Sequence, residues 1–337
     1  MNSAAQDIVT GQSSALAGSL DVQRATLRIT SDFFLRITNL LSGLMDGDLI
    51  KGLVWLGIVE ANVRRLSADP ELSQAYASSE TPPPDSLRDP VSVYALAQSL
   101  RLPYETTRRY VAKLIDSGQA LRVERGVIVP MAAMEAPPVR LASVQFHASL
   151  RRFVEILVKV GAYPDLLGPR PTTGRKPHLA TVSGPPQANT LRRIARTTNS
   201  FYLRTAELLA DAADGDLVRG IVFLGIIQAN VQALNTDLNL SLQYASINDI
   251  PPDELRRPIS VYALAQSLDL PYETTRRYVQ KLIEDGRCTR EPAGIVVSRT
   301  VLAQPAMVAA LERNYANLAH YLAALVRDGL DPRAAGA

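Results

Sequence analysis

One nonapeptide, LPYETTRRY, occurs twice in this chain of 337 residues, at 102–110 and again at 270–278. The identity is wider than the nonapeptide, because within 90–118 only positions 91, 101, 112, 116 and 117 differ from their counterparts in 258–286. The offset from Tyr104 to Tyr272 is far longer than the roughly 20–50 residues of a solenoid repeat, and it is the size of a whole domain. The repeat therefore predicts two copies of one domain.

The repeat continues upstream, where DGDLIKGLVWLGIVEANV at 46–63 aligns with DGDLVRGIVFLGIIQANV at 214–231. Both segments are apolar nearly all round at their centres, which is typical of a helix that is buried on several sides. Lys51 and Glu60 interrupt the first segment, which falls short of the roughly 18 uncharged residues of a membrane span. We therefore expect a buried helix over 47–67 and no membrane association.

Composition changes outside the repeats suggest the domain limits. Residues 1–23 are rich in Ser, Ala, Gly and Gln and are predicted to be a disordered tail, and the Pro- and Gly-rich residues 165–191 are predicted to be a linker. The two repeats then span 24–164 and 192–332. A net charge of +3 is compatible with nucleic acid, and the single cysteine, Cys288, excludes an internal disulfide and suits the cytoplasm.

Local signals within one unit predict two short helices followed by a hairpin. Ser92 is a suitable N-cap for a helix over 93–100, and RLP then forms a tight corner. Pro103 suits the first turn of a second helix that runs to about residue 116 and ends at Gly118. The β-branched residues and the Arg-Gly corner in 120–130 indicate two short strands.

The segment LAQSLRLPYETTRRYVAKLIDSG resembles the helix-turn-helix of bacterial winged-helix regulators of the GntR, MarR and IclR kind. In those proteins a helix of small residues and a turn precede a T-x-R-R helix that closes with L-x-x-x-G. The resemblance covers the helix-turn-helix and hairpin region of each copy and not the flanking helices. It rests on Ala97, Leu100, Leu102, Thr106, Arg108, Arg109, Leu114 and Gly118, and in the second copy on Ala265, Leu268, Leu270, Thr274, Arg276, Arg277, Leu282 and Gly286.

The resemblance implies a mainly α fold with small β-hairpin wings. It implies two tandem winged helix-turn-helix domains with additional flanking helices and a pseudo-twofold arrangement. The first helix-turn-helix would lie at 92–118 with its wing at 120–130. The second would lie at 260–286 with its wing at 288–298.

The second helix of the motif is predicted to have one buried and one exposed face. At about 100° per residue, Leu114, Ile115 and Thr107 lie on the side of Val111. Arg109 and Lys113 lie opposite, while Arg108 lies at the edge of the buried face. Tyr104 stands where relatives often carry a basic residue, and it is predicted either to contact the DNA backbone or to belong to the core.

The resemblance places DNA contacts in the first turns of this helix and in the wing, where arginine binds guanine O6 and N7 or phosphates. Glu105 could accept from a cytosine amino group or merely adjust the charge of the helix N-terminus. The second wing, with Glu291 beside Arg290, looks weaker than the first. The predicted DNA-binding residues are Tyr104, Glu105, Thr106, Arg108, Arg109, Lys113, Arg122 and Arg125, with Tyr272, Glu273, Thr274, Arg276, Arg277, Lys281 and Arg290.

Signs of catalysis or of a cofactor are missing from the sequence. His147, His178 and His320 lie far apart, no Cys or His pair has metal-ligand spacing, and no phosphate-binding glycine loop is present. We therefore expect neither an enzyme nor a metal or cofactor. Trp55 and Phe223 occupy matching positions in the apolar segments, where a core aromatic is favoured over a ligand pocket.

The sequence thus predicts a cytoplasmic, nucleoid-associated regulator of transcription that binds double-stranded DNA. Two near-identical recognition helices in one chain would read two similar half-sites. One alternative is a plasmid-type replication initiator with tandem winged helices. The other is a tandem winged-helix module that binds protein within a chromosome-segregation complex. The sequence leaves any small-molecule effector unknown.

The apolar helices also predict how the two copies meet. Packing between helices 47–67 and 215–235, and between the C-terminal helices 141–160 and 309–328, would remove excess apolar surface from water. We then expect a monomer that already presents two reading heads. A homodimer with four heads is the competing outcome.

Overall fold

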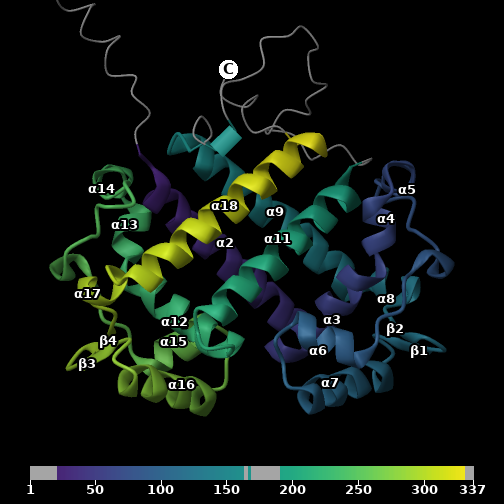
Figure 1. Ribbon diagram of the computed structural model, residues 1–337, viewed down its shortest axis with the longest axis horizontal. Helices are drawn as coiled ribbons and strands as arrows, with labels where there is room; N and C mark the ends of the chain where they lie inside the picture. The colour runs from purple at the N-terminus through teal and green to yellow at the C-terminus, as the bar shows by residue number, and fades with distance from the viewer. Residues whose placement is uncertain (1–20, 163–165, 168–189, 331–337) are drawn as a thin grey trace, which may run out of the picture.

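The computed structural model describes residues 21–162, 166–167 and 190–330, which form a mainly helical molecule with two small hairpins (Figure 1). The first half contains α2 (Gln23–Leu44), α3 (Leu49–Asn62), α4 (Arg64–Ala68), α5 (Pro70–Ala75), η1 (Asp85–Leu87), α6 (Val93–Ser99), α7 (Tyr104–Asp116), β1 (Leu121–Val123), β2 (Gly126–Ile128), α8 (Met131–Met134) and α9 (Pro137–Lys159). The predicted tail and linker fall largely outside the described residues.

The same order of elements recurs in the second half. It contains α11 (Leu191–Asp211), α12 (Leu217–Asn230), α13 (Gln232–Thr236), α14 (Leu238–Gln243), η2 (Asp253–Leu255), α15 (Val261–Ser267), α16 (Tyr272–Glu284), β3 (Thr289–Glu291), β4 (Gly294–Val296), α17 (Arg299–Leu302) and α18 (Pro305–Arg327).

The local signals around α6 and α7 act as predicted. The Ser92 hydroxyl accepts a hydrogen bond from the Ala95 N–H at 3.1 Å, and α7 stops shortly before Gly118, which has a φ of +70°. The corner between the helices places Arg101 in the left-handed region at φ 53°. Pro103 is the N-cap of α7 and not part of its first turn, because its ψ of 137° is extended.

Two helix boundaries differ from the prediction. The helix expected over 47–67 breaks after Asn62 into α3 and α4, because the Asn62 side chain turns to bond the backbone of the β2 region. The last helix, expected from residue 141, begins at Pro137. Pro137 and Pro138 occupy its first turn, where a missing N–H leaves no hydrogen bond unmade.

Each hairpin is attached to the rest of its half by one isolated β-bridge and by the side-chain hydrogen bonds of one asparagine. β1 and β2 are antiparallel, with Leu121 opposite Ile128, and Val91 forms an isolated bridge to Val127. The Asn62 amide donates to Asp89 O at 2.8 Å and accepts from the Val129 N–H at 2.8 Å. The hairpin is therefore tied to the end of the buried helix α3.

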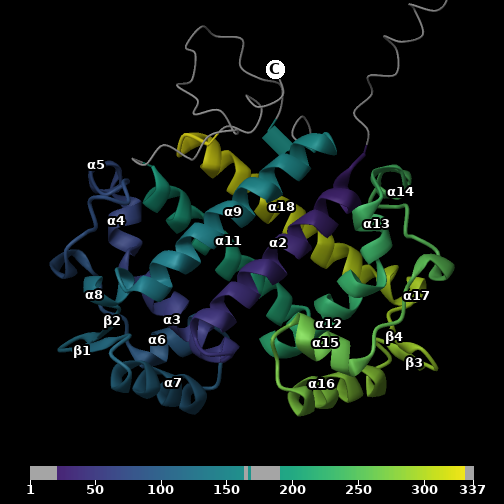
Figure 2. The ribbon, with the colours of Figure 1, turned by 180° about the vertical axis from the view of Figure 1, so that it is seen from behind.

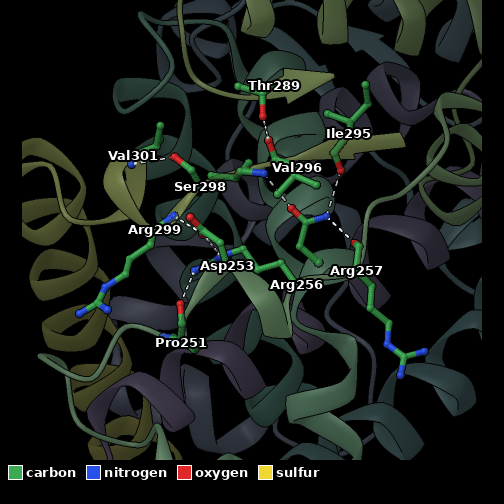
Figure 3. A network of polar contacts seen from close by, with 12 residues as sticks. Pro251, Asp253, Arg256, Arg257, Thr289, Ile295, Val296, Ser298, Arg299 and Val301 are labelled. Carbon is green, nitrogen blue, oxygen red and sulfur yellow. Dashed lines mark hydrogen bonds and ion pairs between the residues drawn. The ribbon is translucent and has the colours of Figure 1, made fainter. Parts of the chain in front are cut away.

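The second half repeats this anchor with Asn230. Its amide donates to Arg257 O at 2.8 Å and to Ile295 O at 3.1 Å, and its oxygen accepts from the Val297 N–H at 2.9 Å (Figure 3). Beside it, Asp253 pairs with Arg256 at 2.9 Å and accepts from the Arg299 N–H at 2.6 Å (Figure 3). These contacts position β3 and β4 against α12 and α17.

The two halves meet through their first helices. The N-terminus of α2 reaches the second half, where the Arg24 and Ala25 N–H groups donate to Ala245 O at 2.8 and 3.2 Å. The N-terminus of α11 reaches the first half, where the Arg192 N–H donates to Ala77 O at 2.9 Å. Each first helix is thus capped by the opposite half.

One turn further along each of these helices, a buried arginine also donates hydrogen bonds to the opposite half. Arg28 donates to Tyr244 O at 2.8 Å and to Ser241 O at 2.9 Å. Arg196, at the matched position, donates to Tyr76 O at 2.9 Å and to Ser73 O at 3.1 Å. At the centre, the rings of Phe34 and Tyr202, also at matched positions, stack with their centroids 4.7 Å apart.

The expected interface is confirmed in part, because the predicted helices α3, α12 and α18 contact the opposite half, but their partners there are α2 and α11. α2 packs on α12 and α18 of the second half, and α11 packs on α3 of the first, so α2 and α11 organise the contact (Figures 1 and 2). The apolar helices α3 and α12 bury their surface largely within their own halves, against α2 and α7 or α11 and α16.

Candidate nucleic-acid interface

The helices α7 and α16 lie side by side along one edge of the molecule. They occupy the lower edge in both views, and the β1–β2 and β3–β4 hairpins lie at the two outer ends (Figures 1 and 2). The central helices α2, α9, α11 and α18 lie on the other side of the two helix-turn-helix units. One face of the molecule thus presents both helices and both hairpins together.

The buried face of α7 matches the predicted periodicity. Thr107, Val111 and Leu114 are buried, and the corresponding residues of α16 are buried as well. Tyr104 is 47% exposed and Tyr272 is 46% exposed, so the prediction that Tyr104 belongs to the core is wrong. A tyrosine at the first position of the helix projects outward before the apolar stripe begins.

The exposed face of each helix carries the predicted charged side chains. Arg108 is exposed rather than at the edge of the core, and its Nε lies 2.9 Å from a Glu105 oxygen. Arg276 and Glu273 form the same contact at 2.9 Å. Exposed ion pairs within one helix turn are weak and screened by salt, so both arginines can exchange this contact for an external anion.

A cleft of about 840 Å³ runs between the two helices. The predicted residues of α7 differ in their relation to this cleft. Thr106 and Arg109 line it, whereas Glu105 and Arg108 do not. Thr274 and Arg277 line it from the other side. Four aspartates from the turns before α3 and α12, Asp46, Asp48, Asp214 and Asp216, also line this cleft.

The tyrosine after each arginine pair orients the basic side chains. The Tyr110 ring lies 4.6 Å from Lys113 Nζ and 5.4 Å from the Arg109 guanidinium carbon. Burial and the neighbouring Asp48 carboxylate raise the pKa of Tyr110, so its hydroxyl stays protonated. Lys113 also lies 3.6 Å from Asp48, which makes it less available to an external anion than Arg109.

The wing residues are exposed and unequal between the halves. The first hairpin exposes Arg122 and Arg125 beside one acid, Glu124, while the second exposes Arg290 beside Glu291. The first hairpin therefore keeps a net positive charge and the second does not. The predicted residues all come to one edge, in two clusters related by the repeat.

The structure adds residues that periodicity did not identify. Tyr94 and Tyr262 are 63% and 62% exposed on α6 and α15, beside α7 and α16. Arg101 crosses to the second half, 3.4 Å from Glu207 and 3.8 Å from Asp211. The signal for Arg101 was its replacement by Asp269, one of the few differences between the two motifs.

Comparisons with protein-family models, with curated proteins and with solved structures found no match to this chain. Within residues 21–162, 166–167 and 190–330, no helix has the length and apolar character that crossing a membrane requires. In that same part of the chain, no three His, Cys, Asp or Glu side chains gather as metal ligands would.

Proposed function

We propose that this chain is a regulator of transcription that binds double-stranded DNA with α7 and α16. In this proposal each half is a winged helix-turn-helix domain, the two arose by duplication, and an approximate twofold axis relates them. The stacking of Phe34 on Tyr202 supports the axis, because matched residues meet each other where a twofold axis passes through an interface.

The observation that carries the proposal is the shared edge. Both copies of YETTRRY begin a helix, bury Thr107 or Thr275, and leave their arginines exposed, and the two helices lie along the same edge of the molecule. Recognition helices that enter two major grooves on one side of a duplex require this arrangement. The hairpins at the outer ends are then placed to contact the flanking backbone or minor groove.

The proposal assigns the DNA contacts to the exposed arginines and to Tyr104. Arg109 and Arg277, which line the cleft, and Arg108 and Arg276, which lie outside it, supply base and phosphate contacts. The hydroxyl of Tyr104 contacts a phosphate. The aspartates in the cleft repel the phosphates, so the DNA backbone is expected to pass over the helices and not into the cleft.

A mobility-shift assay with fragmented genomic DNA from the source organism tests the proposal. We expect a subset of fragments to be retarded, with affinity that falls steeply as salt rises. The double variant Arg109→Ala with Arg277→Ala should lose the retarded bands. Arg36→Ala with Arg204→Ala removes the same charge from matched, exposed positions of α2 and α11 and serves as the control.

Two results would count against the proposal. Equal retardation by the recognition-helix variant and the control would show that these arginines do not contact DNA. Retention of no fragment at low salt would instead favour a protein-binding module. If the retained fragments map to a replication origin and not to promoters, the chain is a replication initiator.

A further inference from the structure

A cavity of about 150 Å³ lies between α2 of the first half and α11, α12 and α18 of the second. Its walls are mainly apolar and include Phe34, Phe223 and Met307. An apolar cavity of this size takes up a single aromatic ring. Phe223 is therefore a core aromatic, as the sequence favoured, and it also lines a pocket.

At three positions of this wall the second half has smaller side chains than the first half, while Met307 and Leu311 are larger than the matched Val139 and Ser143. In the first half, the larger residues are buried or packed against the core. The difference is several carbon atoms and changes the shape of the space. The pairs are Ala212 and Leu44, Ala213 and Met45, and Asn314 and Phe146. In the first half the matched residues Leu40, Leu44, Trp55, Val139 and Ala142 line a cleft of about 760 Å³.

A buried cation without a counter-charge forms part of the same wall. Arg28 is only 7% exposed, and its Nη atoms bond carbonyl oxygens and the Ser241 hydroxyl. Its Nε has no hydrogen-bond partner. Burial, followed by the repulsion of Arg24, lowers the pKa of Arg28 to about 10.

The matched arginine shows what Arg28 is missing. Burial lowers the pKa of Arg196 to about 10 as well, but two nearby carboxylates, Asp328 and Glu60, oppose this shift. The position matched to Glu60 is Gln228, which lines the cavity and donates to Arg28 O at 2.9 Å. The surroundings of Arg28 therefore contain the neutral amide of Gln228 where those of Arg196 contain the carboxyl group of Glu60.

We propose that this cavity binds a small apolar monocarboxylate of about the size of benzoate, with its carboxylate at Arg28. The ring occupies the space beside Phe34 and Phe223, and the carboxylate binds the Arg28 Nε, which has no other hydrogen-bond partner. The Asn314 Oδ1, which lines the cavity and has no partner, accepts a hydrogen bond from a ligand that carries a hydroxyl group. This site does not depend on DNA binding.

Isothermal titration of the full chain with benzoate tests the inference, with hexanoate as a second carboxylate and benzyl alcohol as the neutral analogue. We expect one saturable site per chain for benzoate, and affinity for benzyl alcohol that is lower by about tenfold or more. The absence of saturable binding by either carboxylate would overturn the proposal. Equal binding of benzyl alcohol would overturn the role of Arg28.

Two variants and one control locate the site. Ala212→Leu introduces the residue found at position 44 and should abolish benzoate binding. Gln228→Glu supplies the internal acid found at position 60 and should weaken benzoate by about tenfold or more without affecting benzyl alcohol. Ala309→Leu, on the exposed side of α18, should bind benzoate like the wild type.

The variants remain informative if one of them is poorly folded. Circular dichroism establishes folding before each titration. If Ala212→Leu is unfolded, Gln228→Glu decides the question through the ratio of benzoate to benzyl alcohol affinity. Unchanged benzoate binding in a folded Ala212→Leu or a folded Gln228→Glu would place the ligand elsewhere and refute the proposal.

Discussion

Helices α7 and α16 and the wall of the apolar cavity show opposite patterns when the two halves are compared. From Tyr104 to Val111 every residue of α7 is identical to its counterpart in α16, although half of these residues are exposed. In the wall of the cavity, the half-buried Ala212 and Asn314 stand where the first half has the larger Leu44 and Phe146.

This contrast is the reverse of what stability alone would produce. Exposed substitutions usually change stability by less than about 0.5 kcal/mol, while loss of buried carbon atoms costs several times more. The identity of the exposed side chains of α7 and α16 is what a shared binding target requires, and it supports the proposal that both helices bind DNA.

The largest expected effect comes from the centre of the molecule, where the halves touch. Tyr202→Ala removes a fully buried ring that stacks on Phe34, and we expect a loss of about 3–5 kcal/mol in the free energy of unfolding. Urea denaturation followed by circular dichroism measures this loss. Tyr202→Phe keeps the ring and loses only the 3.0 Å contact with the Thr38 hydroxyl, so about 1 kcal/mol is expected.

The shape of the unfolding curve tests whether the halves form one unit. The N-termini of α2 and α11 each bond to the opposite half. We therefore expect a single unfolding transition, which Tyr202→Ala shifts as a whole. A curve that splits, with only one transition moved by Tyr202→Ala, would mean that the halves are independent and that the interface does not couple them.

The next effect compares the recognition helices. Arg109→Ala and Arg277→Ala should each weaken specific DNA binding by about 1–3 kcal/mol, and by similar amounts, because the two helices are identical around these residues. Both side chains are exposed, so the thermal unfolding midpoint should stay the same. Fluorescence anisotropy with one bound fragment measures both losses, and a large loss in one half only would show that a single helix reads DNA.

How much of this could be read from the sequence depended on the range of each signal. The two short helices α6 and α7 were predictable because Ser92, Gly118 and the apolar stripe around Val111 act locally. The contacts of α2 and α11 with the opposite halves were not predictable. Arg28 bonds carbonyl groups far away in the chain, and in the sequence it looks like any surface arginine. The sequence carried one sign of these contacts, since both residues of each pair recur at the repeat offset, Arg28 as Arg196 and Tyr76 as Tyr244.

A smaller effect separates the two wings. Arg125→Ala should reduce the slope of log affinity against log salt by about 1, because one phosphate contact is lost. Arg290→Ala should reduce it by less, because Glu291 leaves the second hairpin without a net positive charge to hold it against the phosphates. Binding measured at four salt concentrations gives both slopes. Equal slopes for the two variants would remove the asymmetry that we infer for the wings.

The smallest effect concerns the acid that only the first half has. Burial raises the pKa of the Glu60 carboxyl, although the Ser200 hydroxyl and nearby arginines oppose the shift. The folded state then holds this proton more tightly than the unfolded state, so stability falls as pH rises above the ordinary value of 4.5. Relative to Glu60→Gln, the wild type should lose stability from pH 4.5 upward, as measured by urea unfolding across pH. A constant difference would contradict this.

The measurement that tests the central claim most directly is selection of bound sequences from a random duplex pool by the full chain, followed by footprinting. Because α7 and α16 present the same side chains on one edge, we predict two copies of one short motif, inverted or direct, with centres separated by about one helical turn or a multiple of it. Two unrelated motifs, a single motif, or no enrichment over the pool would contradict the account.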